Sequence, residues 1–154
     1  MARIIQATKR EIPSLVELMR KLAGYERLNP PNEEAVERLS GDLGKRFDAY
    51  LANIDGRDVG YSILMEKYSS FEAMPVLYLH DLFVLEEYRD KGIGRELFAH
   101  ALSEAKARNC CRMEWEVLRD NELAIRFYER RGATRLDNWI QYRLDRDDLE
   151  QLTI

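Results

Sequence analysis

Two glycines stand where an apolar segment is followed by a helical pattern. Gly92 and Gly94 follow the apolar run that ends at Val84, and a long amphipathic segment begins beside them. The start of a helix offers backbone N–H groups that have no intrahelical partner, and glycine lets a bulky anion approach them. This segment is therefore predicted to bind a phosphate or pyrophosphate group. A tight strand-to-helix turn that holds no ligand fits the same spacing.

Two common phosphate-binding motifs do not fit this segment. A P-loop ends in Gly-Lys-Ser or Gly-Lys-Thr, whereas Gly94 is followed by Arg95 and Glu96. The dinucleotide-binding fingerprint needs a third glycine at the position that Leu97 occupies, and an acidic residue at a set distance beyond it. The ligand expected here is therefore of another class.

Two polar residues, His80 and Asp81, interrupt the apolar segment 76–84. Adjacent residues of a strand point to opposite faces, and a buried polar group is costly unless it has a partner. An imidazole accepts a proton near neutral pH, so His80 is a candidate general base that acts directly or through water. A hydrogen-bonded histidine of the core is the alternative interpretation.

A tyrosine lies on the apolar face of a predicted helix that begins at Asn121. A phenol has an ordinary pKa of about 10, which suits Tyr128 to protonate a departing thiolate. A core tyrosine whose hydroxyl is bound to a backbone carbonyl fits the spacing as well. Asn121 itself is predicted to be the N-cap of this helix.

The elements that must position these residues alternate along the chain. Strands are predicted over residues 3–7, 48–54, 59–67, 76–84, 112–117 and 134–144. Helices are predicted from near residue 11 to a loop at 28–32, and over 33–43, 92–108 and 121–132, with a terminal turn or helix over 146–152. The result is an α/β domain, a mixed sheet with helices on both faces.

The segment 76–84 is predicted to lie in the middle of this sheet, because both of its faces are apolar. Alternation places its apolar side chains in two sets, Val76, Tyr78, Leu82 and Val84 on one face and Leu77, Leu79 and Phe83 on the other.

Composition and charge narrow the function further. The chain has 154 residues, suited to one domain, and a net charge of −4, which argues against nucleic acid or an anionic membrane as partner. It has no apolar run of the roughly 18 residues that a membrane span needs, and no secretory signal is expected. Cys110 and Cys111 are adjacent and form no disulfide framework, so a cytoplasmic location is expected. His80, His100 and the cysteines lack zinc spacing, so no metal site is expected.

Several motifs together resemble one family. Arg89-x-x-Gly92-x-Gly94 resembles the acyl-CoA signature of the GNAT acetyltransferase superfamily. Four further segments are similar to its spermidine/spermine and thialysine N-acetyltransferase branch: residues 78–84 with 88–89, residues 21–26, residues 121–133, and Trp139. The resemblance extends over nearly the whole chain and implies a GNAT fold with a mostly antiparallel central sheet.

The resemblance implies acetyl-CoA as co-substrate. Backbone amides of residues 89–94 would hold the pyrophosphate, and backbone groups of Leu82 and Val84, at a splayed strand end, would bind the pantetheine arm and the thioester carbonyl. The residues implied to contact acetyl-CoA are Leu82, Phe83, Val84, Arg89, Asp90, Lys91, Gly92, Ile93, Gly94, Arg95, Asn121 and Tyr128. Tyr128 matches the position of the family's general acid.

The resemblance also implies an acceptor site. Tyr25 and Glu26 would close it from the first helix, and Glu26 would pair with an ammonium group or relay its proton, although a solvated carboxylate fits the sequence as well. Phe71 would supply an apolar wall or serve as an exposed loop anchor. Asp81 matches the family and would contact the amine or order the strand end. The branch usually carries glutamate where this chain has His80, so the site has one negative charge fewer, which favours a short diamine or lysine-like amine over spermine.

The sequence is thus interpreted as a single GNAT domain over residues 1–154. It is expected to transfer the acetyl group of acetyl-CoA to a primary amine of a small diamine, polyamine or lysine-like substrate by direct attack. The resemblance implies a homodimer. The alternatives are an acetyltransferase for protein lysines or N-termini, and a catalytically silent acyl-CoA-binding module on the same fold.

Overall fold

The computed structural model describes residues 1–153 as two compact units, Met1–Glu116 and the part that begins at Val117. The single domain expected over residues 1–154 stays a prediction. Within the described residues, no helix is long and apolar enough to cross a membrane. The same residues contain no group of three or more histidine, cysteine or acidic side chains placed to hold a metal ion.

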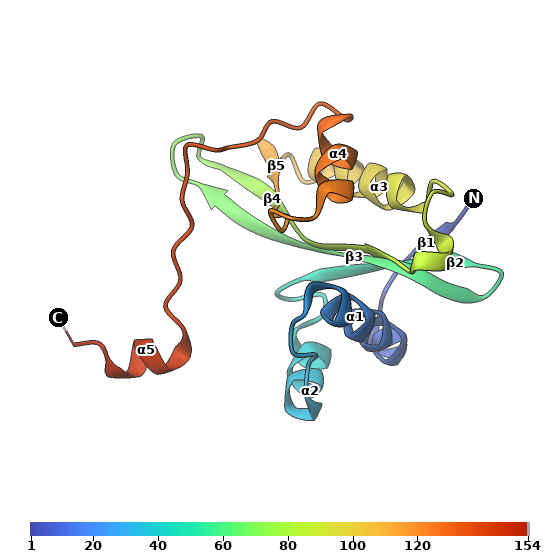
Figure 1. The fold of residues 1–154 in the computed structure, drawn as a ribbon, viewed down its shortest axis with the longest axis horizontal. Helices are drawn as coiled ribbons and strands as arrows, with labels where there is room; N and C mark the ends of the chain where they lie inside the picture. The colour runs from blue at the N-terminus through green and yellow to red at the C-terminus, as the bar shows by residue number, and fades with distance from the viewer. Residues whose placement is uncertain (154) are drawn as a thin grey trace. The chain divides into compact units, whose positions relative to one another are not determined.

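The first unit is built on a five-stranded sheet in the order β1-β2-β3-β4-β5 (Figure 1). The strands are β1 (Arg3–Gln6), β2 (Asp48–Ile54), β3 (Arg57–Ser69), β4 (Met74–Val84) and β5 (Arg112–Glu114). Neighbouring strands are antiparallel except β4 and β5, which are parallel. The predicted mixed sheet is confirmed, and β4 lies between β3 and β5 as expected for a strand that is apolar on both faces. β5 ends at Glu114, short of the predicted residue 117.

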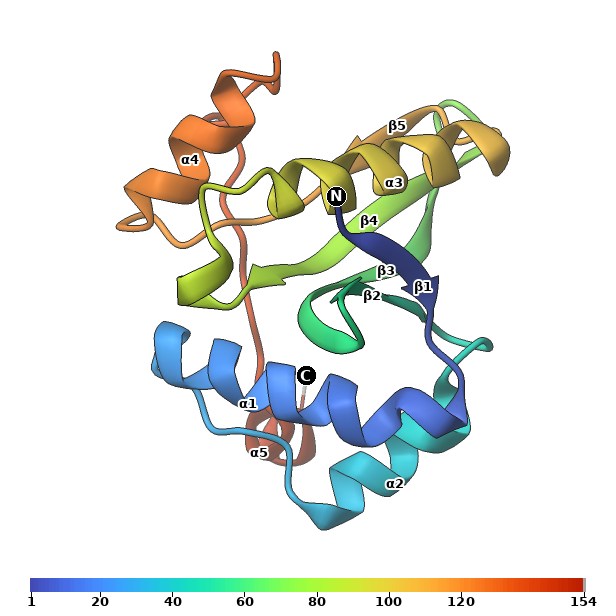
Figure 2. The same cartoon turned by 90° about the vertical axis from the view of Figure 1, so that its right-hand side faces the viewer.

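Helices cover both faces of this sheet, as predicted. They are α1 (Ile12–Glu26), α2 (Glu33–Asp42) and α3 (Ile93–Ala107), with short 3-10 turns η1 (Lys9–Glu11) and η2 (Glu86–Tyr88). Figure 2 shows α1 on one side of the strands and α3 on the other. The buried residues Leu15, Val16 and Leu18 of α1 pack with Tyr61 and Phe83 of the sheet, because they recur at helical spacing on one side of the helix.

A β-bulge interrupts the pairing of β3 with β4. Ile63 pairs with Asp81, but the next residue, Leu64, pairs with Leu79. His80 is therefore an extra residue in β4 that has no counterpart in β3, which is the definition of a bulge. Because strand side chains alternate, one extra residue reverses which face each later side chain occupies.

The bulge overturns the predicted distribution of β4 side chains. Phe83 packs beneath α1 together with Met65, which pairs with Tyr78. Leu82 and Val84 instead pack in the cluster formed around α3. The expectation that Tyr78 shares a face with Leu82 and Val84 is therefore wrong. Tyr78 lies on the α1 face of the sheet, together with Phe83.

The second unit contains α4 (Glu122–Glu129) and α5 (Arg146–Gln151). The predicted N-cap is confirmed, because Asn121 Oδ1 accepts a hydrogen bond of 3.2 Å from the backbone N–H of Ala124. The predicted strand over residues 134–144 is wrong, since those residues form no strand. Their alternating apolar residues, such as Ile140 and Tyr142, are exposed, and the described part of this unit offers no other strand with which they could pair.

Gly60 of β3 gives a test of this packing. A Cβ atom there would lie 2.7 Å from the carbonyl oxygen of Phe83 and 3.2 Å from a methyl group of Val84. We expect Gly60→Ala to lower the free energy of unfolding by about 1–3 kcal/mol through overpacking. Gly41→Ala in α2 is the control, since its Cβ meets nothing within 4 Å, and it should stabilise by about 0.5–1 kcal/mol. Urea denaturation measures both, and equal effects would contradict this account.

Candidate functional site

The strand β4 has one edge that is only partly used. β5 pairs with it at residues 76–78 and then ends, whereas β3 pairs with β4 from Met74 to Val84 except at the bulge residue His80. Among the described residues, no β5 partner follows for residues 79–84, so β4 and β5 separate at this point. This is the splayed strand end that the resemblance implies. Backbone N–H and C=O groups along such an edge can bind an extended ligand, because unpaired backbone groups need partners.

The segment after β4 presents the start of a helix. Gly92 has φ +87° and is the N-cap residue of α3, which begins at Ile93 without a side-chain cap. The amide of Glu96 donates to the carbonyl of Gly92 at 3.0 Å, so the three amides before it in the helix lack an intrahelical acceptor. A Cβ at Gly92 would meet nothing within 4 Å. Open space and free amides at the positive end of a helix suit a phosphate group.

Two basic residues stabilise this loop. Arg89 Nε donates to the carbonyl of Val84 at 3.1 Å, and its guanidinium lies 4.9 Å from the ring centre of Tyr25. Lys91 Nζ donates to the carbonyl of Glu87 at 2.9 Å. Arg89 therefore connects the end of β4 with the last turn of α1. Phosphate contacts by Arg89, Asp90, Lys91 and Arg95 stay predictions.

Two carboxylates meet on the α1 face of β4. The hydroxyl of Tyr61 donates to Asp81 Oδ2 at 3.1 Å. Burial raises the pKa of Asp81, and the nearby His80 and the Tyr61 hydrogen bond offset part of this effect. Burial also raises the pKa of Glu26, and the negative charge of Asp81 raises it further. The structure thus brings Glu26, His80 and Asp81 together, as the predicted acceptor site requires.

His80 differs from its predicted setting. Its side chain is exposed, so the interpretation as a core histidine is wrong. Its ring lies 6.0 Å from that of Tyr78, on the α1 face, where Asp81 contacts Tyr61. The expectation that His80 and Asp81 point to opposite faces is also wrong, because a bulge lets consecutive side chains share a face. An exposed imidazole beside two carboxylates can take a proton and pass it to water.

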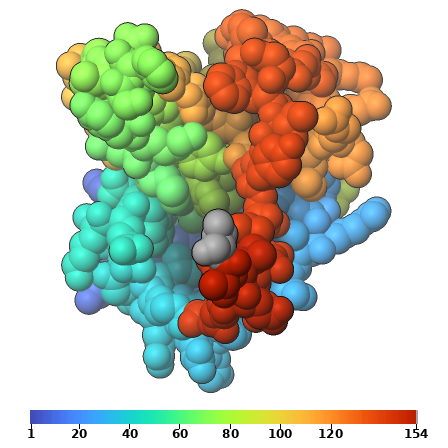
Figure 3. Space-filling model, turned by 90° about the vertical axis from the view of Figure 1, so that its left-hand side faces the viewer, coloured from blue at the N-terminus to red at the C-terminus, as the bar shows by residue number. Residues whose placement is uncertain are grey.

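The other predicted site residues lie in different places. Tyr25 is partly exposed at the end of α1, beneath Arg89. Phe71 is fully exposed in the turn between β3 and β4, which Figure 3 shows at the surface in green. Met74 and Asp81 are seven residues apart, roughly 20 Å along the strand, so the structure does not bring Phe71 to the carboxylates, and its role as a wall stays a prediction. Asn121 and Tyr128 belong to the second unit, and their predicted contacts with acetyl-CoA also stay predictions.

Sequence reasoning missed Tyr61. This residue is fully buried, yet its hydroxyl reaches Asp81. Burial and the charge of Asp81 raise the pKa of Tyr61 far above its ordinary value, so its hydroxyl stays a proton donor. Little in the sequence indicated this role for Tyr61, because a tyrosine in a strand is ordinarily a packing residue.

Comparison with known proteins identifies the class. The sequence pattern of the acetyltransferase (GNAT) family matches residues 12–133. A thialysine N-epsilon-acetyltransferase from Caenorhabditis elegans is 25% identical over 146 residues, which cover 92% of this chain and 91% of the relative. An L-ornithine N5-acetyltransferase from Arabidopsis thaliana is 36% identical over 93 residues, 60% of this chain and 41% of that protein.

Solved structures agree with this class. The crystal structure of a probable acetyltransferase has a TM-score of 0.82 and 29% identity to this chain, and the match covers 93% of this chain and 97% of that one. The chain therefore belongs to the GNAT acetyltransferase family and is an acetyltransferase. Enzymes of this family use acetyl-CoA as co-substrate. The resemblance, fold class and enzyme class predicted from the sequence are confirmed.

The raised pKa of Asp81 predicts a pH-dependent stability. The folded protein binds this proton more tightly than the unfolded chain, whose carboxyl titrates near its ordinary value of 3.8. Ionisation therefore costs stability, and the cost grows as the pH rises from the ordinary value through the raised one. We expect Asp81→Asn, which keeps an acceptor for Tyr61, to be more stable than wild type at pH 7. The difference should vanish below about pH 4.

Urea denaturation at several pH values measures this difference. Glu37→Gln, at an exposed position of α2, is the control and should show no such trend. A variant Asp81→Asn that is less stable than wild type at pH 7 would contradict the prediction.

Proposed function

We propose that this acetyltransferase transfers the acetyl group of acetyl-CoA to a primary amine of a small diamine, polyamine or lysine-like amino acid. The observation that carries the proposal is the meeting of Glu26, His80 and Asp81 at the point where β4 separates from β5. An amine bound there lies beside the strand edge that leads to the open start of α3. The named relatives support this choice, since thialysine and ornithine both carry a side-chain amine.

The co-substrate half of the site uses backbone groups. The amides at the start of α3 and Gly92 would hold the pyrophosphate, and the edge of β4 at Leu82 and Val84, which β5 does not cover, would bind the pantetheine arm. When bound, acetyl-CoA supplies the thioester carbonyl that the amine attacks. A strand amide near Leu82 would stabilise negative charge on that carbonyl oxygen.

The acceptor half must attract a cation and then remove its proton. A primary amine is protonated at neutral pH, because its pKa is about 10. The negative charges of Glu26 and Asp81 attract the ammonium form. His80 is exposed beside them and is the proposed base, taking the proton directly or through water, with Glu26 as the alternative relay.

The number of charges favours short substrates. The site holds two carboxylates, and His80 stands where the related polyamine branch usually has a third. A long polyamine carries several ammonium groups, so it gains less here than a substrate with one or two. We therefore propose a short diamine or lysine-like amine as substrate in preference to spermine. A homodimer and a cytoplasmic location are part of the same proposal.

An amine panel tests the proposal together with its general acid. Wild-type protein should release CoA thiol from acetyl-CoA in the presence of short primary amines. Tyr128→Phe removes the acid, so kcat should fall by about 10²–10⁴ while the affinity for acetyl-CoA changes little. Tyr142→Phe, an exposed tyrosine of the same unit, is the control and should retain full activity. A fall of less than about threefold in Tyr128→Phe would identify Tyr128 as a packing residue instead.

The phosphate site has a separate test in two variants of one residue. Gly92→Ala and Gly92→Asp share the strain of a side chain at φ +87°, but only the aspartate places a negative charge before the pyrophosphate. Calorimetric titration should show acetyl-CoA binding at least about tenfold more weakly to the aspartate variant than to the alanine variant. Equal affinities would mean that the phosphates bind elsewhere.

A further inference from the structure

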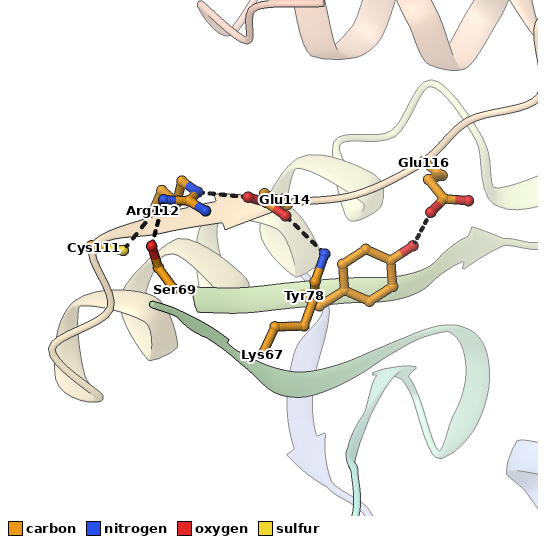
Figure 4. Close-up of polar contacts among 7 residues, drawn as sticks. All are labelled: Lys67, Ser69, Tyr78, Cys111, Arg112, Glu114 and Glu116. Carbon is orange, nitrogen blue, oxygen red and sulfur yellow. Dashed lines mark hydrogen bonds and ion pairs between the residues drawn. The ribbon is translucent and has the colours of Figure 1, made fainter. Parts of the chain in front are cut away.

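A strip of charged and aromatic side chains lies on the sheet next to the proposed acceptor site (Figure 4). Lys67 Nζ of β3 donates to Glu114 Oε2 of β5 at 2.9 Å and lies 4.9 Å from the ring centre of Tyr78. Arg112 Nε donates to the other oxygen of Glu114 at 2.6 Å. Tyr78 in turn donates to Glu116 Oε1 at 2.9 Å. We call these five residues the polar strip.

The polar strip and the acceptor site share one face of the sheet. Because the bulge reverses the side chains of β4, Tyr78 lies on the α1 face with Asp81. Tyr78 connects the two groups, with Lys67 over its ring and the ring of His80 6.0 Å away. Burial and the charge of Glu116 raise the pKa of Tyr78 to about 12, so its hydroxyl stays a neutral donor at physiological pH.

Lys67 is held in place by a carboxylate that it shares with a second cation. Glu114 is shared between Lys67 and Arg112, so one carboxylate faces two cations. The side chain of Lys67 is 52% exposed, and an ammonium group has three N–H donors. At least one donor is therefore available to solvent, while Glu114 and the Tyr78 ring hold the ammonium group in place.

The charges fit one class of substrate better than the others. The acceptor site carries two carboxylates. Lys67 of β3 adds a positive charge beside the Tyr78 ring of β4. A diamine or polyamine that extends from the acceptor site would bring its second ammonium toward Lys67, where like charges repel. A lysine-like amino acid would bring a carboxylate there instead, which an ammonium binds by a charge-assisted hydrogen bond.

We propose that Lys67 binds the α-carboxylate of a lysine-like amino acid whose side-chain amine is acetylated beside His80 and Asp81. The inference rests on the proposed function and narrows its substrate to amino acids. Six single bonds of about 1.5 Å separate the terminal amine of lysine from its carboxylate carbon, a reach below about 9 Å. Ornithine is one bond shorter. The two ends of the substrate would bind near the Tyr78 ring, which lies 4.9 Å from Lys67 Nζ and 6.0 Å from the His80 ring.

Matched substrates and variants test the role of Lys67. Lysine and 1,5-diaminopentane differ only by the carboxylate, as do ornithine and 1,4-diaminobutane. Lys67→Met keeps the length and the contact with the Tyr78 ring but removes the charge. We expect kcat/KM for lysine and ornithine to fall at least about tenfold, mainly through KM, with kcat/KM for the two diamines unchanged or higher. Lys67→Arg should restore most of the preference, and Lys106→Met, exposed on α3, is the control.

The outcomes separate the inference from the proposed function. A parallel loss for amino acids and diamines would make Lys67 a structural residue and overturn the inference, as would an unchanged ratio between them. A wild-type enzyme that prefers the diamines would also overturn it, while leaving the proposed function intact. Failure of every amine to release CoA would overturn the proposed function, and the inference with it.

Discussion

The site depends on how the backbone hydrogen bonds of β4 are distributed. On one side, β3 pairs with the strand from Met74 to Val84 except at His80, while on the other side β5 stops after residues 76–78. Backbone N–H and C=O groups at a strand edge that no neighbouring strand covers need another hydrogen-bond partner, such as water or a ligand. Here the open edge is followed, after η2 and a short loop, by the start of α3, whose first amides have no intrahelical acceptor. A long ligand with a phosphate at one end suits such an arrangement.

The proposed acceptor site is held at some cost to stability. Glu26 and Asp81 both have raised pKa values because burial opposes their ionisation, and the charge of Asp81 adds to this effect at Glu26. A purely structural arrangement would neutralise such groups with arginine or lysine. This is what happens on the α3 face, where Arg108 pairs with Asp48 and Glu104, each at 2.8 Å. Partly buried carboxylates whose ionised form is stabilised by a histidine and a phenol, rather than by arginine or lysine, are typical of functional sites and favour that interpretation here.

Local patterns predicted most of the fold, and nonlocal pairing explains the failures. The helices and strands of the first unit follow from apolar spacing, and the Asn121 cap from the preference of asparagine for that position. The bulge at His80 could not be predicted, because one extra residue leaves no mark on the composition of β4 and becomes visible only against β3. The sequence therefore indicated His80 and Asp81 but misplaced their faces, and it gave no sign of the contact between Tyr61 and Asp81. The failed strand at 134–144 has the same origin, since alternation shows that a segment can form a strand but not that a partner is within reach.

The bulge separates residue 80 from the register of β4. Any side chain at position 80 leaves Tyr78 and Lys67 facing the same side as Asp81, so this position is free to vary in charge while the rest of the surface is kept. Removing the extra residue would leave Asp81 opposite Ile63 and Tyr78 opposite Met65, so both side chains would stay on the α1 face and only the imidazole would be lost. Within this architecture, substrate preference can diverge by substitution or loss of the residue at position 80 without a shift of the strand.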